Sequence, residues 1–151
     1  MKPVNSELVW LSCAVDFEGS IIMYPNWSPT GVPTSIRANT TILTNTDLAL
    51  LRYAQKLLRK YKVGNRLVPL SNSKRWSKKW KKAWRVEVST IDDNKKLLVL
   101  LHPFLISKKK QCELVLRFLS KRDSKHNRHR ETTAQDWKLM AQCQFLNKRG
   151  L

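Results

Sequence analysis

The chain has 151 residues, and its 29 lysine and arginine residues against 11 aspartate and glutamate residues give it a net charge of +18. This length fits one domain that can bury a core of its own. The charge favours a polyanionic partner, with nucleic acid first and an anionic membrane surface second, and a charge-rich surface without a partner is the alternative.

The three cysteines, Cys13, Cys112 and Cys143, are odd in number and widely spaced. They exclude a disulfide framework and a CxxC metal or redox motif, so we expect a reducing, intracellular location, in the cytoplasm or an organelle. No long apolar run occurs, and the first residues lack the apolar segment of a signal peptide. We therefore expect a soluble protein that neither spans a membrane nor is exported.

The first half of the chain predicts a helix, a hairpin and a second helix. Apolar residues at 8–17 predict a buried helix capped by Asn5 or Ser6. Residues 20–28 and 35–44, with turn residues between them, predict a β-hairpin. Apolar residues then recur every three or four positions from Leu48 to Tyr61, which predicts a helix capped by Thr46 or Asn45 and ending at 63–64.

The second half predicts two more strands and three more helices. The expected segments are strands at 66–70 and 84–90 joined by a basic loop, helices at 97–101 and 112–119 separated by Pro103, a basic linker at 120–130 and a helix at 134–146. The predicted order is therefore α-β-β-α-β-β-α-α-α. We expect an α+β core domain at 1–121, with residues 122–151 as a linker and helix packed on the same domain.

Residues 11–19, Leu-Ser-Cys-Ala-Val-Asp-Phe-Glu-Gly, place small side chains in the first helix and two acids and a glycine at its end. Small residues let two helix backbones approach closely, and glycine lets the chain turn at once into a strand. This segment resembles the nine-residue signature of the LAGLIDADG homing endonucleases, whose α-β-β-α-β-β-α order also matches. The resemblance implies a curved antiparallel DNA-binding sheet and a metal-dependent DNA endonuclease.

The resemblance also implies roles for the two acids. In this family the second acid of the signature is a metal ligand, which corresponds here to Glu18, with the backbone carbonyl of Phe17 as a further ligand. Carboxylate oxygens suit Mg²⁺, and Mn²⁺ is expected to substitute for it. Many relatives carry aspartate at this place, so the glutamate is a departure. Asp16 is expected to be structural, and the alternative for Glu18 is an ordinary exposed acid at a helix end.

Two distant segments extend the resemblance. His102-Pro103-Phe104-Leu105, followed by Lys108 and Lys110, is similar to a stretch in which the first lysine reaches the active site, which implies that role for Lys108. Leu43-Thr44-Asn45-Thr46-Asp47 resembles a strand-to-helix corner whose polar residue positions the attacking water, which implies that role for Asn45. The alternatives are a solvated lysine and a helix cap.

The resemblance implies hydrolysis in which a metal-positioned water attacks phosphorus in line and the 3′ oxygen leaves. Cutting both strands needs two such sites, and the chain carries one signature. A homodimer on a near-palindromic double-stranded DNA site is therefore expected. The predicted dimer contacts come from the first helix: Leu11, Ser12, Cys13, Val15 and Asp16.

Alternation along the strands predicts which side chains face the major groove. In the second strand polarity favours Arg37 and Asn39, although the family register near Asn45 implies the opposite parity, and a bulge would reconcile the two. The predicted DNA contacts are Ser20, Ile22, Tyr24, Asn26, Ser28, Arg37, Asn39, Arg66, Val68, Leu70, Arg85 and Glu87 on the strands, Lys74, Arg75, Lys78 and Lys79 in the basic loop, and Lys110 in a helix.

Two other functions remain open. A LAGLIDADG-type splicing factor that binds intron RNA without cutting would use the same fold and charge, although the presence of Glu18 disfavours it. Trp76, Trp80 and Trp84 fall four residues apart, as in a basic helix for a membrane surface or ribosomal RNA. The alternation after Trp84 favours a strand instead. His126 and His129 are expected to lie in a solvated linker rather than a metal site.

Overall fold

The computed structural model of this chain describes residues 5–70, 79–122 and 131–148. Within these residues the elements are α1 (Ser6–Glu18), β1 (Ser20–Trp27), β2 (Pro33–Asn45), α2 (Leu48–Lys60), β3 (Arg66–Pro69), β4 (Trp84–Val88), α3 (Ile91–Leu101), α4 (Lys109–Leu119) and α5 (Ala134–Leu146). The predicted α+β fold and element order are confirmed. In this part of the chain no helix has the length and apolar character needed to cross a bilayer.

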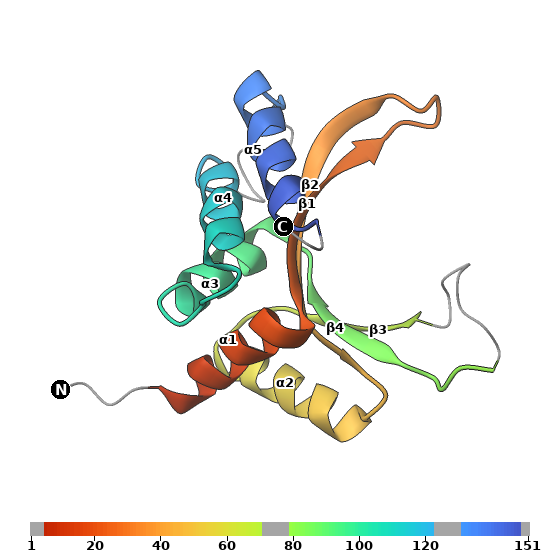
Figure 1. The fold of residues 1–151 in the computed structure, drawn as a ribbon, viewed down its shortest axis with the longest axis vertical. Helices are drawn as coiled ribbons and strands as arrows, with labels where there is room; N and C mark the ends of the chain where they lie inside the picture. Colours follow the sequence, from red (N-terminus) through yellow and green to blue (C-terminus); the bar gives the residue numbers. More distant parts are fainter. Residues whose placement is uncertain (1–4, 71–78, 123–130, 149–151) are drawn as a thin grey trace.

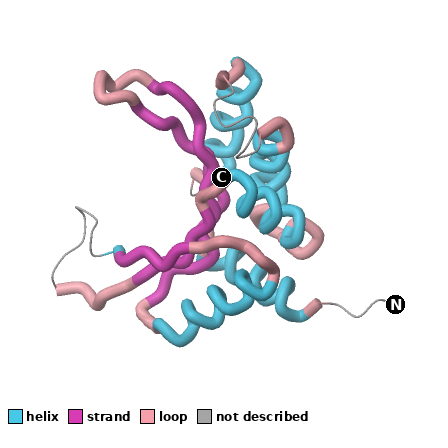
Figure 2. Tube along the Cα trace, turned by 180° about the vertical axis from the view of Figure 1, so that it is seen from behind, coloured by secondary structure: helices cyan, strands magenta, loops and turns pink. Residues whose placement is uncertain are grey.

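The four strands form one antiparallel sheet in the order β1-β2-β4-β3. The sheet is strongly curved, and the described helices all lie against its convex side (Figure 1). Seen from behind, the concave side stays free of helices along both hairpins (Figure 2). One face of the sheet is thus committed to the core, and the other, which we call the open face, is available to a partner.

Side-chain caps fix the starts of α1, α2, α3 and α5. The Asn5 side chain accepts from the backbone N–H groups of the first turn of α1, as predicted. The N-cap of α2 is Asp47, not Thr46 or Asn45, because the Asp47 carboxylate accepts from the free N–H groups of Ala49 and Leu50 in the first turn. Thr90 caps α3, which therefore begins six residues earlier than the predicted residue 97.

The buried stripe of α1 corrects the predicted dimer contact. Leu11, Ser12 and Val15 are at most 1% exposed within the single chain. The Ser12 hydroxyl donates to the carbonyl of Leu101, so its small side chain lets α3 approach and not a second copy. These three side chains face the chain's own core, and the prediction that they contact a partner is wrong. Cys13 is exposed on the opposite side of the helix.

Gly19 joins α1 to β1 at a point where there is no room for a side chain. A Cβ atom here would lie 2.2 Å from the carbonyl oxygen of Thr41 and 2.6 Å from that of Ile42. The φ of Gly19 is −95°, which any residue can adopt. The glycine is therefore required by close contact with β2 rather than by its conformational freedom, and that contact fixes the end of α1 against the sheet.

A bulge in β2 explains why polarity near Arg37 and the family register near Asn45 predicted opposite alternations of side chains along this strand. Thr41 pairs with Glu87 and Leu43 pairs with Val86, so Ile42 is an extra residue in β2. Before the bulge, odd-numbered residues of β2 face the open side, and after it even-numbered residues do. Because paired residues share a face, the open face carries Ser20, Ile22, Tyr24, Asn26, Ser35, Arg37, Asn39, Thr41, Thr44, Arg66, Val68, Arg85 and Glu87.

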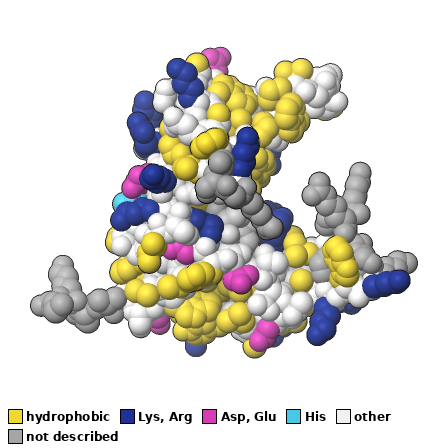
Figure 3. Space-filling view, viewed as in Figure 1, with side chains coloured by type: hydrophobic (Ala, Val, Ile, Leu, Met, Phe, Trp, Pro, Cys, Tyr) yellow, Lys and Arg dark blue, Asp and Glu magenta, His cyan; other side chains and the backbone are white. Residues whose placement is uncertain are grey.

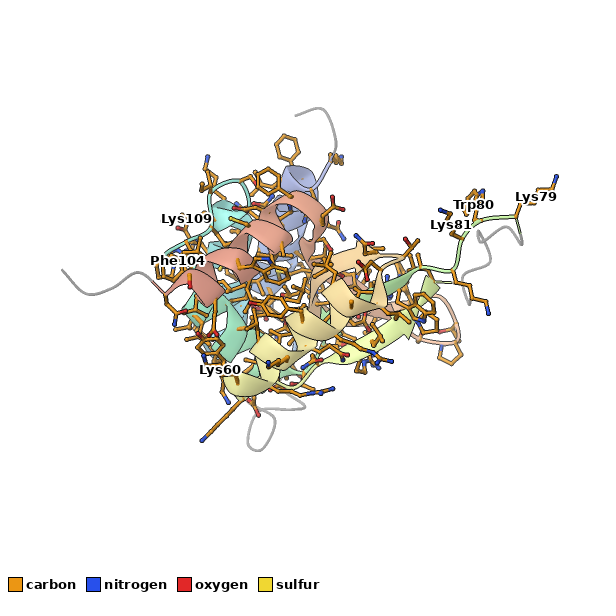
Figure 4. The ribbon with its side chains drawn as sticks, turned by 90° about the horizontal axis from the view of Figure 1, so that it is seen from below. Lys60, Lys79, Trp80, Lys81, Phe104 and Lys109 are labelled. Carbon is orange, nitrogen blue, oxygen red and sulfur yellow. The ribbon has the colours of Figure 1, made fainter. Side chains whose placement is uncertain are left out.

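The second hairpin is a strand pair, which contradicts the alternative of a continuous basic helix through Trp84. Trp84 is the first residue of β4 and pairs with Asn45 on one side and Pro69 on the other. Lys79, Trp80 and Lys81 lie toward the tip of this hairpin, on the side of the molecule away from Phe104 and Lys109 (Figure 4). Predicted sites at Lys74, Arg75 and Lys78, and the solvated linker predicted around His126 and His129, lie outside the described residues.

Candidate active site and nucleic-acid interface

The end of α1 is tied to the loop before α4 through the carboxylate of Asp16. One carboxylate oxygen accepts from the backbone N–H of Ile106 at 2.8 Å. The other accepts from the Ser107 hydroxyl at 3.0 Å and from the Lys108 N–H at 2.9 Å. These donors lower the pKa of Asp16, although partial burial alone would raise it. Asp16 therefore has the structural role expected of it, and because its side chain is only partly buried, its dimer contact stays a prediction.

These hydrogen bonds to the Asp16 carboxylate hold Lys108 at the end of α1. The Lys108 ammonium group donates to the backbone carbonyl of Asp16, two residues before Glu18. Burial of the Lys108 side chain lowers its pKa, against the raising effect of the nearby Asp16 carboxylate. Two segments 92 residues apart in sequence thus bring a carboxylate and a cation to one end of one helix.

Glu18 is the last residue of α1 and is exposed, and its neighbour Phe17 is 83% exposed. No group of three or more histidine, cysteine or acidic side chains capable of holding a metal occurs among the residues that the structure describes. One carboxylate and one carbonyl are still a suitable donor set for Mg²⁺, which keeps several waters and takes further oxygen ligands from substrate phosphates. The residues present fit such a cation only together with a phosphate-bearing partner.

Asn45 ends β2 on the side of the sheet that faces the helices, opposite Trp84. Its side-chain oxygen accepts from the N–H of Asp47 at 2.9 Å and so shapes the turn into α2. In the described part of the chain its amide nitrogen has no partner, and no hydrogen bond joins it to Glu18 or Lys108. Hydrogen bonds to Asp16 hold Lys108 at the end of α1, whereas no hydrogen bond within the described residues joins Asn45 to this end of the helix.

Most of the predicted DNA contacts on the strands share the open face, which confirms their predicted parity. Ser28 lies beyond β1, where its hydroxyl bonds Thr30 and accepts from the N–H of Val32. Leu70 follows β3 and its N–H donates to Ala83. Lys110 is exposed on α4 and lines a groove between α4 and α5 instead of the open face.

The burial of Glu87 contradicts the prediction that this residue contacts DNA directly. It lies on the open face but is only 3% exposed. Its carboxylate is surrounded by Arg66, Arg85 and Asn39. Sequence alternation predicted the face of Glu87 but not its burial. The burial depends on a contact with Arg66, which lies on another strand, β3.

An apolar stripe that is half-buried at Val9 and exposed at its other residues runs along the outer side of α1. Val9, Cys13 and Phe17 recur at spacing four, and the 87% exposed Ile106 lies beside the end of the stripe through its contact with Asp16. We call these four residues the α1 outer stripe. Hydrophobic atoms gather over α1 in the lower half of the space-filling view, below the hollow between the two hairpins (Figure 3). Phe17 and Ile106 are the two most exposed of the large apolar side chains in the described residues.

The sequence matches no protein-family model and no curated protein, whereas solved structures share its fold. The homing endonuclease I-CvuI in complex with its target superposes with a TM-score of 0.68 at 18% identity, over 97% of this chain and 84% of that chain. The archaeal intron-encoded homing endonuclease I-Vdi141I complexed with DNA gives 0.72 at 15% identity, over 99% and 89%. The I-SmaMI LAGLIDADG homing endonuclease bound to cleaved DNA gives 0.62 at 17%, over 99% of this chain but 45% of that chain. This chain has the LAGLIDADG homing endonuclease fold, as predicted.

Proposed function

We propose that this protein is a site-specific double-strand DNA endonuclease that acts as a homodimer with a divalent cation, Mg²⁺ in the first place. The observation that carries the proposal is the end of α1, where an exposed carboxylate and a clasped lysine lie beside an open, curved sheet face. The solved proteins of the same fold are homing endonucleases complexed with DNA, and I-CvuI was crystallised with Ca or with Mg.

In the proposed mechanism each residue at this end of α1 has one task. Glu18, with the Phe17 carbonyl, would hold the cation, which supplies Lewis-acid stabilisation of developing negative charge and a more acidic bound water. Lys108, held by Asp16, would place a positive charge beside the reacting phosphate. The Asn45 amide, whose oxygen already shapes a turn, would orient a water through its nitrogen. Asp16 acts only through Lys108 and is a positioning residue.

Hydrolysis of both DNA strands needs two copies of this site. The chain contains one signature segment, so the second copy would come from a second chain related by a two-fold axis. The α1 outer stripe supports this arrangement, because Phe17, the neighbour of Glu18 in the chain, and Ile106, whose N–H donates to Asp16, both expose apolar side chains at this end of α1. Packing this stripe on its twin would bring two Glu18 side chains close together over one duplex.

The cleavage assignment is tested with supercoiled plasmids that carry a randomised library of sites, incubated with Mg²⁺ and sequenced at the cut ends. The wild type should cut a recurring site, and Glu18→Gln should lower the rate by about a thousandfold, since loss of a metal ligand removes several kcal/mol of transition-state stabilisation. Glu113→Gln, which changes an exposed acid on α4, should cut like the wild type. Equal activity of wild type and Glu18→Gln would overturn the assignment.

The homodimer is tested by thiol crosslinking at Cys13, which is exposed on α1, whereas Cys112 and Cys143 are buried. Burial raises the pKa of Cys112 to about 12 and that of Cys143 to about 11, so both stay protonated near pH 8. A short bis-maleimide should give a covalent dimer with the wild type and none with Cys13→Ser. A monomeric mass in solution at every concentration, and no crosslinked species, would rule the dimer out.

A second candidate function is binding of structured RNA, as in a splicing factor. It is favoured by the basic side chains that are exposed on the helices, away from the open sheet face, among them Arg52, Lys56, Arg59, Lys110 and Arg117. A duplex on the open face would not neutralise these charges. Filter binding of a folded group I intron RNA, with no cleavage of any DNA in the library, would favour this candidate over the endonuclease.

A further inference from the structure

A buried carboxylate lies in the middle of the open sheet face. Glu87 Oε1 accepts from Arg66 Nη2 at 2.7 Å, and Oε2 accepts from Asn39 Nδ2 at 3.4 Å. Arg85 Nε lies 3.0 Å from Oε2 as an ion pair without the alignment of a hydrogen bond. The Glu87 side chain is 4% exposed, whereas the side chains of Arg66 and Arg85 are 64% and 40% exposed. The acid is covered, and the two guanidinium groups reach the surface.

This arrangement needs an explanation, because an acid on a DNA-facing sheet repels the phosphates of its partner. Two arginines offset the charge of one carboxylate, so the cluster as a whole remains positive. A long arginine side chain loses considerable rotamer freedom when it is fixed for recognition. An acid buried behind two arginines restricts that freedom before the ligand arrives, which lowers the entropic cost of binding.

The exposed donors that remain fit one kind of ligand. Glu87 contacts one terminal nitrogen of Arg66 and the Nε of Arg85, so each guanidinium keeps N–H groups directed to other partners. In the major groove, paired donors of this kind are complementary to the O6 and N7 acceptors of guanine. The side-chain oxygen of the 9% exposed Asn39 has no partner in the described residues, so the floor of the cluster also carries an unmatched acceptor.

The position of the cluster relates it to the candidate active site. Ser20, Thr41, Glu87 and Arg66 are successive partners across the four strands, so they form one row on the open face. This row begins directly after Gly19, and Arg85 is two residues away along β4. Two residues of a strand span about 7 Å, or roughly two base pairs. The bases read by the two arginines are therefore expected in the inner part of a half-site, near the cut.

We propose that Glu87 is a positioning residue that orients Arg66 and Arg85 to recognise guanines within about two base pairs of each other in each half-site. This inference rests on the proposed DNA-binding function and adds the base class and the residues that read it. It also changes the assignment of Glu87 from a DNA contact to a residue that acts through its two arginines.

The test is the base preference at every position of the half-site, measured by cleavage and by binding of a randomised DNA library. Arg66→Gln and Arg85→Gln should each lower the preference for guanine at one position about tenfold. Glu87→Gln should broaden the preference at both positions, while its affinity for random-sequence DNA stays equal to the wild type or rises, since a negative charge is removed. Arg37→Gln, an exposed arginine of the same face without contact to Glu87, is the matched control and should leave these two positions unchanged.

The possible results separate this inference from the proposed function. Preserved guanine preference in Glu87→Gln, together with a lowered melting temperature, would show that the acid is structural and would overturn the inference. Loss of preference in Glu87→Gln but not in either arginine variant would also overturn it. If the wild type shows no sequence preference on any DNA, the endonuclease proposal itself fails, and this outcome is read from the wild type alone.

Discussion

The end of α1 and the centre of the open sheet face each carry one glutamate, and the two are in opposite environments. Glu18 is exposed at a helix end, where the helix dipole disfavours an acid, and it follows an exposed phenylalanine. Glu87 is buried and fully engaged by neighbours on β2, β3 and β4. The first carboxylate is free to bind a cation from solution, and the second already neutralises cations of the protein.

The comparison shows that the position of an acid on the functional face does not define its task. Both glutamates border the open face, yet only Glu18 is placed to contact a ligand directly. Removal of Glu87 should therefore change mainly stability and base selectivity, and removal of Glu18 should change mainly the rate of cleavage.

The largest effect on folding is expected for Gly19→Ala, at the junction that connects the two regions. The added methyl group would lie 2.2 Å from the carbonyl of Thr41, the β2 partner of Glu87. The backbone at the end of α1 and the backbone of β2 are both held by the sheet and cannot separate freely. We therefore expect the free energy of unfolding to fall by about 3 kcal/mol or more. Urea unfolding followed by circular dichroism measures this loss. Gly31→Ala, at an open turn with a φ of 79°, is a comparison in which only backbone strain acts and the loss should be smaller.

Glu87→Ala should have the next largest effect. It leaves Arg66, Arg85 and Asn39 without their shared carboxylate, but the two arginines can turn to water. We therefore expect about 2 kcal/mol of destabilisation rather than the larger cost of a fully buried pair, or a fall of about 6 °C in melting temperature. Glu87→Asp should recover little of it, since the shorter side chain does not span the gap between the two arginines. Wild-type stability in Glu87→Asp would contradict the bridging role of Glu87 between Arg66 and Arg85.

Asp16→Asn should have a smaller effect that depends on pH. The native pKa of Asp16 lies below its ordinary value of 3.8, so the carboxylate stabilises the fold above that pH. The stabilisation is lost as the pH falls through the lowered native pKa. At pH 7 we expect Asp16→Asn to lose about 1–2 kcal/mol, discounted for partial exposure. The gap between wild type and variant should shrink below about pH 4, and a gap that is constant from pH 7 to pH 3 would exclude a role for the charge.

Glu18→Ala should change folding least of all. The side chain is exposed at the end of α1 and no described residue bonds to it. We expect a melting temperature within about 1 °C of the wild type, measured without divalent cation. Mg²⁺ with specific DNA should raise the melting temperature of the wild type more than that of the variant. A large loss of stability in Glu18→Ala without ligand would erase the contrast with Glu87.

The order of helices and strands was predictable because periodicity and turn residues mark it along the sequence. The early start of α3 was also readable, since Thr90 followed by Asp93 is a capping pattern. So was the inward stripe of α1, because Leu11 and Val15 recur at helical spacing. The bulge at Ile42 could be suggested only as a way to reconcile two patterns, and the structure supplied its position.

The site was predictable only in part. The signature predicted Glu18 and the segment that follows His102 predicted Lys108, and the structure shows how Asp16 joins these two segments. The burial of Glu87 was not predictable, since it depends on Arg66, which is 21 residues away in sequence and on another strand. Alternation gives the face of a residue, whereas exposure depends on how neighbouring strands place their longest side chains.

The extra residue at Ile42 also constrains how such a protein can change over generations. Before Ile42 the odd-numbered residues of β2 point to the open face, and after Ile42 the even-numbered residues do. A single codon lost or gained within β2 would exchange the two faces of one half of the strand, turning Arg37 toward the core and apolar residues such as Ala38 toward the open face. The residues of the open face can therefore change by substitution along β2, whereas changes of length are tolerated at the hairpin tip around Gly31.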